Sequence, residues 1–168
     1  MSRKILSILA LVVPLTILYL VYTGAIDYFE AFLGIIVSIV VGLLFADIVV
    51  KNPGKLYNPV RWIYGLLYAF LYFTIIEAKA HLQVISLIIN PSRLKPAIVR
   101  ISYNVKTDYA VTAVANSITN TPGTVVIDID ESRKVMYVHW IRAIKLSDEE
   151  ARKMVSELFE KYAHKIFD

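Results

Sequence analysis

The feature that most restricts how this chain can fold is an uncharged apolar stretch near its start, residues Ile5–Tyr22. As an α-helix, these 18 residues would be about 27 Å long, which is close to the ~30 Å hydrocarbon core of a bilayer. The preceding Arg3 and Lys4 also suit a signal peptide, but no clear cleavage site follows, and a second apolar stretch begins within a few residues. The pattern therefore predicts a retained membrane helix.

A second apolar stretch, Tyr28–Val50, follows a short loop and predicts a second membrane helix. Gly34 and Gly42 within it would permit close packing against another helix, although two glycines eight residues apart are weak evidence. Asp47 lies about one turn from the end, where a carboxylate can reach the interface. We therefore interpret Asp47 as an end residue that extends to water, and keep a functional role as the alternative.

Basic residues flank the two apolar stretches on the same side of the predicted hairpin. Arg3 and Lys4 precede the first stretch, and Lys51, Lys55 and Arg61 follow the second. Because cytoplasmic segments carry an excess of Lys and Arg, both ends of the hairpin are expected in the cytoplasm of a cell-membrane protein.

A third segment, about residues 60–90, has the pattern of a long amphipathic helix. At 100° per residue, one stripe is polar and rich in tyrosine, with Arg61, Tyr64, Tyr68, Tyr72, Lys79, Gln83, Ser86 and Asn90. The opposite side is apolar, with Trp62, Ile63, Leu66, Phe70, Phe73, Val84, Ile85 and Ile88. If this helix crossed the membrane, the basic residues after it would lie outside, against the charge rule. Two spans plus a long, partly embedded helix on the cytoplasmic side are therefore favoured, and three spans remain the alternative.

Two ionisable residues of this segment, Glu77 and His81, are expected to project from its apolar side. At a spacing of four residues they can pair with each other along a helix. Pairing, or a hydrogen bond to a neighbouring protein, is the favoured interpretation. A role in a proton or ion path is the alternative, because ionisable residues among apolar neighbours are costly.

The charge content rises sharply after Ser92. The first 92 residues carry six Lys/Arg and four Asp/Glu, whereas the remainder carries twelve and ten. This step divides the chain into a membrane domain, residues 1–92, with helices at about 5–22, 28–50 and 60–90, and a water-exposed domain, residues 93–168.

The sequence pattern of the second domain predicts a small α+β fold. Apolar residues alternate over 99–105, 125–129 and 135–141, which is typical of half-buried strands. A helix is expected after Thr107, ending before Pro122 and Gly123, and a last helix from Ser147, through a capping box with Glu150, to about Lys165. The order is β-α-β-β-α, with the helices on one face of a three-stranded sheet.

Several functional classes find no support in the residues. The chain has no cysteine and three scattered histidines, so neither a metal site nor a cofactor is expected, and the common catalytic motifs are absent. Asp128 and Asp130 alternate with apolar residues as outward strand positions, and His139 is interpreted as a structural or interface residue. The net charge of +4 is spread over the chain, which does not suit nucleic-acid binding.

Two stretches carry a family signature, residues 115–124 (ANSITNTPGT) and residues 137–141 (YVHWI). With the two-span hairpin and the long third helix, they resemble the MnhE/MrpE family, whose members are subunits of the Mrp-type multisubunit Na+/H+ antiporters. The resemblance extends to homologous subunits of archaeal energy-converting complexes of the membrane-bound hydrogenase type. The residues that carry the resemblance are Asn116, Ser117, Thr119, Thr121, Pro122, Gly123, Thr124 and His139.

The resemblance implies an accessory subunit that helps to assemble an ion-translocating module, has no enzyme activity of its own, and places its C-terminal domain in the cytoplasm. Its partners would be other hydrophobic subunits of an antiporter or hydrogenase-type complex. From the residues, the motif is expected to form a helix end and a turn, as a fold and docking element rather than a sodium site.

Two other functions remain as alternatives. The chain could be a small carrier that uses Glu77 and His81, or a membrane-anchored module whose α+β domain docks a soluble partner.

Overall fold

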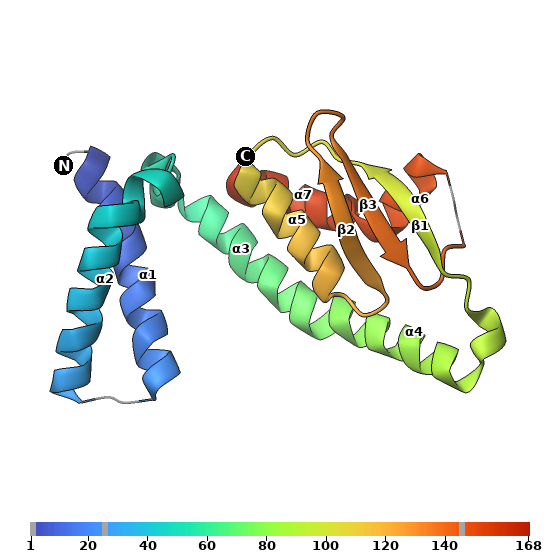
Figure 1. Ribbon diagram of the computed structural model, residues 1–168, viewed down its shortest axis with the longest axis horizontal. Helices are drawn as coiled ribbons and strands as arrows, with labels where there is room; N and C mark the ends of the chain where they lie inside the picture. The colour runs from blue at the N-terminus through green and yellow to red at the C-terminus, as the bar shows by residue number, and fades with distance from the viewer. Residues whose placement is uncertain (1–2, 25–26, 145–146) are drawn as a thin grey trace. The chain divides into compact units, whose positions relative to one another are not determined.

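The computed structural model describes residues 3–24, 27–144 and 147–168. The chain forms two compact units, residues 1–59 and 60–168. The predicted fold class is confirmed: long apolar helices come first, and a small α+β region with a three-stranded antiparallel sheet follows (Figure 1). Three helices of the described chain are long and apolar enough to cross a membrane, Arg3–Thr23, Tyr28–Val49 and Pro59–Ile89.

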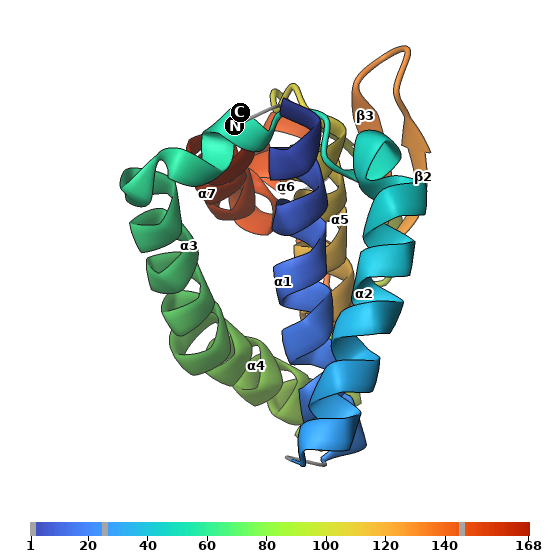
Figure 2. The ribbon, with the colours of Figure 1, turned by 90° about the vertical axis from the view of Figure 1, so that its left-hand side faces the viewer.

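The first unit is an antiparallel hairpin of α1 (Arg3–Thr23) and α2 (Tyr28–Val49), which lie side by side (Figure 2). Small residues four apart on α2 face α1 and are buried: Gly34, Ser38, Gly42 and Ala46. A Cβ built on Gly42 would lie 2.7 Å from Cγ2 of Val12. Close packing at the two glycines, weakly indicated by the sequence, is therefore what the hairpin uses.

The loop end of the hairpin is fixed by polar contacts. The backbone N–H of Glu30 donates to Oδ1 of Asp27 at 2.8 Å, an N-cap for α2. The hydroxyl of Tyr19 on α1 donates to Oε2 of Glu30 at 2.9 Å. The bond between Tyr19 and Glu30 joins the two helices where the chain reverses.

The second unit begins with one long helix made of α3 (Pro59–Leu71), a π-helical turn (Tyr72–Ile76) and α4 (Glu77–Ile89). The expected helix at 60–90 is present, and it contains a π-helical turn that the sequence pattern does not predict. The turn adds a residue to one helical repeat and so rotates the side chains that follow it.

The α+β region is built from β1 (Ala97–Ser102), α5 (Asp108–Asn120), β2 (Thr124–Asp130), β3 (Val135–Trp140), α6 (Asp148–Val155) and α7 (Glu157–Phe167). The strands pair antiparallel in the order β1-β3-β2, and a bulge interrupts the register between Val126 and Asp128. The core lies between one face of the sheet and the helices, and its most buried side chains include Ile101, Val114, Ile118, Met136 and Val138.

The last predicted helix is wrong in one respect, because it is broken at Ser156 into α6 and α7. The break brings Glu160 of α7 back onto Arg152 of α6, whose guanidinium donates to both carboxylate oxygens at 3.1 and 2.9 Å. The hydroxyl of Ser156 and the backbone N–H of Asn104 also donate to this buried carboxylate. A continuous helix could not make this set of contacts, since residues eight apart lie more than two turns from each other.

Candidate functional site

The family motif lies at the C-terminal end of α5, where its hydroxyls satisfy helical carbonyls. The hydroxyls of Ser117, Thr121 and Thr124 donate to the carbonyls of Ala113, Ser117 and Ile118, each at 2.7 Å. The Ser117 and Ile118 carbonyls belong to the last turn of α5, so Thr121 and Thr124 stabilise the helix end. The Ser117 hydroxyl bonds back to a carbonyl inside the helix.

The turn after α5 depends on Gly123, whose φ of +100° is rarely adopted by other residues. The backbone N–H of Ile141 donates to the Gly123 carbonyl at 3.0 Å, which fixes the turn against the end of β3. The hydroxyl of Thr119 accepts from the backbone N–H of Val126 at 3.1 Å. The motif therefore joins α5 to both β2 and β3.

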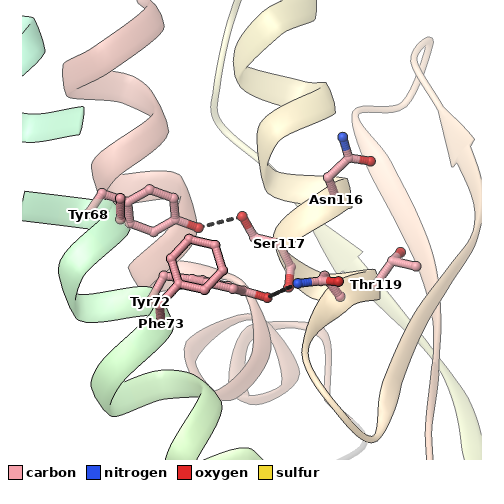
Figure 3. Close-up of a pocket in the computed structure, with 8 residues that line it drawn as sticks. Tyr68, Tyr72, Phe73, Asn116, Ser117 and Thr119 are labelled. Carbon is pink, nitrogen blue, oxygen red and sulfur yellow. Dashed lines mark hydrogen bonds between the residues drawn. The ribbon is translucent and has the colours of Figure 1, made fainter. Parts of the chain in front are cut away.

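The long helix contacts the α+β region through a row of side chains that we call the tyrosine face: Arg61, Tyr64, Tyr68 and Tyr72. Tyr68 and Tyr72 make its contacts with α5. The hydroxyl of Tyr68 is hydrogen-bonded to the hydroxyl of Ser117 (Figure 3). The hydroxyl of Tyr72 accepts from the side-chain amide of Asn120 at 3.2 Å, and lies 3.3 Å from the Ser117 carbonyl and from the Thr121 hydroxyl. The motif hydroxyls therefore serve both the helix end and the contact with the long helix.

The same face also contacts α7. The rings of Tyr68 and Tyr162 are stacked with centroids 5.2 Å apart, and Nζ of Lys165 lies 4.3 Å from the centroid of the Tyr64 ring. The guanidinium of Arg61 donates to the Ile166 carbonyl at 2.7 Å. The tyrosine face is thus an internal packing surface of the second unit, along most of α3.

An open groove of about 500 Å³ lies between the long helix and α5. Its walls are the rings of Tyr68, Tyr72 and Phe73 on one side and polar residues of α5, among them Asn116 and Thr119, on the other (Figure 3). The lining contains no acid, base or cysteine, and the described residues hold no group of three or more His, Cys, Asp or Glu that could bind a metal. The groove offers hydrogen bonds and aromatic surface, without a catalytic constellation.

The structure corrects the expectation that Glu77 and His81 both project from the apolar side of the long helix. The backbone N–H of Glu77 bonds to the carbonyl of Tyr72, five residues earlier, and the wider turn rotates Glu77 toward the side of Tyr72. Its side chain is only 16% exposed, against 63% for His81. Nδ1 of His81 lies 2.8 Å from the Glu77 carbonyl and 3.4 Å from Oε2. Oε1 is buried and makes no hydrogen bond of normal geometry to a described residue, although the Tyr72 hydroxyl is near enough to interact with this carboxylate.

The remaining residues singled out from the sequence lie away from the family motif and the tyrosine face. His139 pairs with Ile98 and Val125 and faces outward from the sheet, because its neighbours Val138 and Trp140 are buried in the core. Asp128 is exposed on β2. Asp47 belongs to the first unit, where it is exposed near the end of α2.

Sequence reasoning missed the partners of the motif. It found the tyrosine stripe and the hydroxyl-rich motif separately, and it did not select Asn120, which bonds to Tyr72. The available signal was the spacing of Tyr64, Tyr68 and Tyr72 at every fourth residue, which places three hydroxyls in a row on one helix.

These features define a class of protein: an integral membrane chain with an apolar helical hairpin, a further long apolar helix and a small α+β region. A family model described as "Na+/H+ ion antiporter subunit" matches residues 12–166. The chain belongs to this family, the MnhE/MrpE subunits of the Mrp-type Na+/H+ antiporters.

Individual relatives agree with the family assignment. The Na+/H+ antiporter E1 subunit of Staphylococcus saprophyticus is 28% identical over 145 residues, which cover 86% of this chain and 87% of the relative. The corresponding E1 subunit of Staphylococcus haemolyticus is 30% identical over 76% of this chain and 77% of the relative. Among solved structures, a chain of the membrane-bound sulfane sulfur reductase, an archaeal respiratory membrane complex, matches with a TM-score of 0.80 and 29% identity, covering 96% of this chain and 99% of that chain.

Proposed function

We propose that the protein is a non-catalytic assembly subunit of a Mrp-type cation/proton antiporter module, and contributes to Na+/H+ translocation by holding other hydrophobic subunits together. The observation that carries this proposal is the use of the family motif. Its hydroxyls form hydrogen bonds at the end of α5 and with the tyrosine face. The adjoining groove is lined by aromatic and neutral polar residues, and its lining contains no acid, base or cysteine. A motif used in this way maintains a shape for partners to bind.

The long apolar helices also suit a subunit that is surrounded by other chains and lipid. Only 11%, 22% and 6% of the most apolar windows of the three helices are buried within the chain itself. Such surfaces require lipid or partner helices, because exposed apolar area of this extent is not stable in water.

The archaeal respiratory complex favours a setting within a larger assembly. The likeness covers nearly the whole chain at 29% identity, and the antiporter relatives are equally similar, so a module inside a respiratory complex and a standalone antiporter are the two candidate parents. The basic residues around the hairpin support a cytoplasmic location for the C-terminal α+β region.

The test separates assembly from transport. Cells that lack this chain are complemented with the wild type or with Ser117→Ala, which removes the hydroxyl bound to Tyr68. The measurements are the amount of intact complex on native gels and Na+/H+ antiport in everted vesicles. An assembly subunit is expected to change the amount of complex while antiport per complex stays constant. Full antiport in its absence, or antiport by the purified chain alone in liposomes, would contradict the proposal.

A second candidate function, a part in the ion path, rests on Glu77. A buried carboxylate oxygen without a hydrogen-bond partner is unusual in folded proteins and requires an explanation. The discriminating variant is Glu77→Gln, which keeps the shape and the acceptor of the side chain. Loss of antiport per complex with assembly intact would support this role, and unchanged antiport would exclude it. Lys79→Gln, at an exposed position of the same helix, is the control.

A further inference from the structure

One side chain of the family motif is not used by the fold of this chain. Asn116 is exposed on α5, and its side-chain amide forms no hydrogen bond to a described residue. The hydroxyls of Ser117, Thr121 and Thr124, by contrast, are all bonded within the second unit. A side-chain amide carries two N–H donors and an oxygen acceptor. Asn116 therefore offers hydrogen bonds that the chain itself does not take up.

Asn116 is one of two side-chain amides in the wall that α5 contributes to the groove. Asn120 follows it after one helical turn, and both line the groove beside Tyr72 and Phe73 (Figure 3). Asn120 donates one N–H to the Tyr72 hydroxyl, and its oxygen and second N–H have no partner among the described residues. Four residues of α-helix rise about 6 Å, so the two amides are spaced by about that distance along α5.

This spacing fits an extended polypeptide. A chain in the extended conformation advances about 6.6 Å every two residues, and its N–H and C=O groups point to the same side at every second residue. Each of these residues presents one donor and one acceptor, which is the set that a side-chain amide can pair with. The amides of Asn116 and Asn120 can therefore bind the backbone of two alternate residues in one extended segment.

The rest of the lining restricts the chemistry of that segment. The opposite wall is formed by Tyr68, Ala69 and Phe73, and the Phe73 ring is 71% exposed, so it offers apolar contact. No residue of the lining carries a charge, and a charged side chain would lose water there without gaining a partner. A lipid acyl chain has neither donor nor acceptor, and it would leave both amides unpaired. The lining therefore favours an uncharged polypeptide.

We propose that the groove between the long helix and α5 is a docking site for an extended, uncharged segment of a different subunit, whose backbone pairs with the amides of Asn116 and Asn120. In binding of this kind, main-chain hydrogen bonds give affinity, and contacts to alternate side chains give specificity. The inference rests on the proposed assembly function, and it adds the place and the form of one contact with a partner.

The first experiment identifies the occupant in the intact complex. The photoreactive amino acid p-benzoylphenylalanine replaces Phe73 in the groove. In the control it replaces Leu66, which is 73% exposed on the same helix and lies outside the groove lining. Native membranes are illuminated, the complex is purified, and the cross-linked peptide is identified by mass spectrometry.

The proposal expects the probe at Phe73 to cross-link to an uncharged segment of a different subunit that copurifies with the chain. Adding Asn116→Leu should abolish this cross-link and leave any cross-link from the probe at Leu66 unchanged. The proposal would be overturned by a cross-link from Phe73 to lipid or to a second copy of this chain. A cross-link that persists with Asn116→Leu, or no cross-link at all, would also overturn it.

The second experiment measures how much the amide contributes to association. Asn116→Leu keeps the size of the side chain and removes its donors and its acceptor, so association with the complex should weaken roughly tenfold. The measurement is the fraction of the chain that remains in the complex on native gels as the detergent-solubilised complex is diluted. Thr112→Val, exposed on the same helix one turn earlier and outside the groove lining, is the matched control and should change nothing.

Two further measurements separate the possible failures. The thermal unfolding midpoint of the full chain should not change with Asn116→Leu, because the amide has no partner among the described residues. If deletion of the chain lowers the amount of complex but Asn116→Leu leaves association unchanged, the assembly function stands and the docking site is wrong. If deletion of the chain changes nothing, both are wrong.

Discussion

The hydroxyl of Tyr72, on the π-helical turn, accepts a hydrogen bond from the side-chain amide of Asn120 at the end of α5, 3.2 Å away. The Tyr72 side chain is almost fully buried in the core of the second unit. Tyr72 therefore joins a helix of membrane-like composition to the α+β region through both its ring and its hydroxyl.

Loss of the Tyr72 hydroxyl should weaken the second unit without disrupting it. Tyr72→Phe keeps the ring, and removes hydrogen bonds that together contribute about 1 kcal/mol. Tyr72→Ala also leaves a cavity, and should cost about 3 to 5 kcal/mol. The midpoint temperature of thermal unfolding, measured on the full chain in detergent, should fall in the order wild type, Tyr72→Phe, Tyr72→Ala. The neighbouring Phe73, which is 71% exposed, provides the control: Phe73→Ala should change stability far less than Tyr72→Ala.

Bulk at Gly42 should separate α1 from α2. A Cβ there would lie 2.7 Å from Cγ2 of Val12, a stiff β-branched side chain, so Gly42→Val should destabilise the hairpin by about 1 to 3 kcal/mol. Adding Val12→Ala should recover part of the loss, because it removes the atom that clashes. Gly65→Val is the matched control, since no atom lies within 4 Å of its added Cβ. Equal effects of the two glycine changes would show that helix packing is not the cause.

The fold was largely predictable because its signals are local. Alternation identified the strands β1, β2 and β3, but it placed Val125 and Ile127 on the wrong face of β2, where a bulge follows Val126 and both side chains are exposed. Thr107 was expected before α5, and its hydroxyl accepts from the backbone N–H of Ala110 at 3.3 Å. The first two long helices follow from apolar length, and the third follows from its amphipathic period. Each of these features depends on residues only a few positions apart, so a single sequence contains the information.

The features that were missed depend on distant contacts. A helical wheel assumes 3.6 residues per turn throughout, so it cannot place Glu77 after a π-helical turn. The break between α6 and α7 follows from the contacts of Glu160 with Arg152 and Asn104, 56 positions before it. The motif's partners on the tyrosine face are 45 to 49 positions away in the sequence, and no periodicity connects them.

Removal of Arg152 should destabilise the chain strongly. The hydrogen bonds to Glu160 raise the pKa of the Arg152 guanidinium above its ordinary value, and the Glu160 carboxylate is 4% exposed. Arg152→Met leaves that charge buried without its cation and should cost about 3 to 5 kcal/mol. The double variant Arg152→Met with Glu160→Gln should be more stable than Arg152→Met alone. Lys153→Ala, which breaks only the exposed pair with Glu149, should cost less than about 1 kcal/mol.

Stability should fall in acid partly through Asp168. Burial is the largest single influence and raises the pKa of this carboxyl. The hydrogen bonds from the His164 ring, from the backbone N–H groups of Thr107 and Lys106 and from the Thr107 hydroxyl together hold the pKa below its ordinary value. A depressed pKa stabilises the fold in full above the unfolded value of about 3.9, and the contribution is lost as pH falls below that toward the folded pKa.

Asp168→Asn should therefore lower stability by about 2 kcal/mol at pH 7, where it removes hydrogen bonds to a charged group, and should have much less effect near pH 2. The measurement is the unfolding midpoint of the full chain between pH 2 and pH 7 in a detergent whose headgroup does not titrate. His164→Ala removes one of the donors and should give a smaller change of the same sign. An equal loss of stability at pH 2 and pH 7 would mean that Asp168 acts through packing, because a packing contribution does not require the carboxylate to be charged.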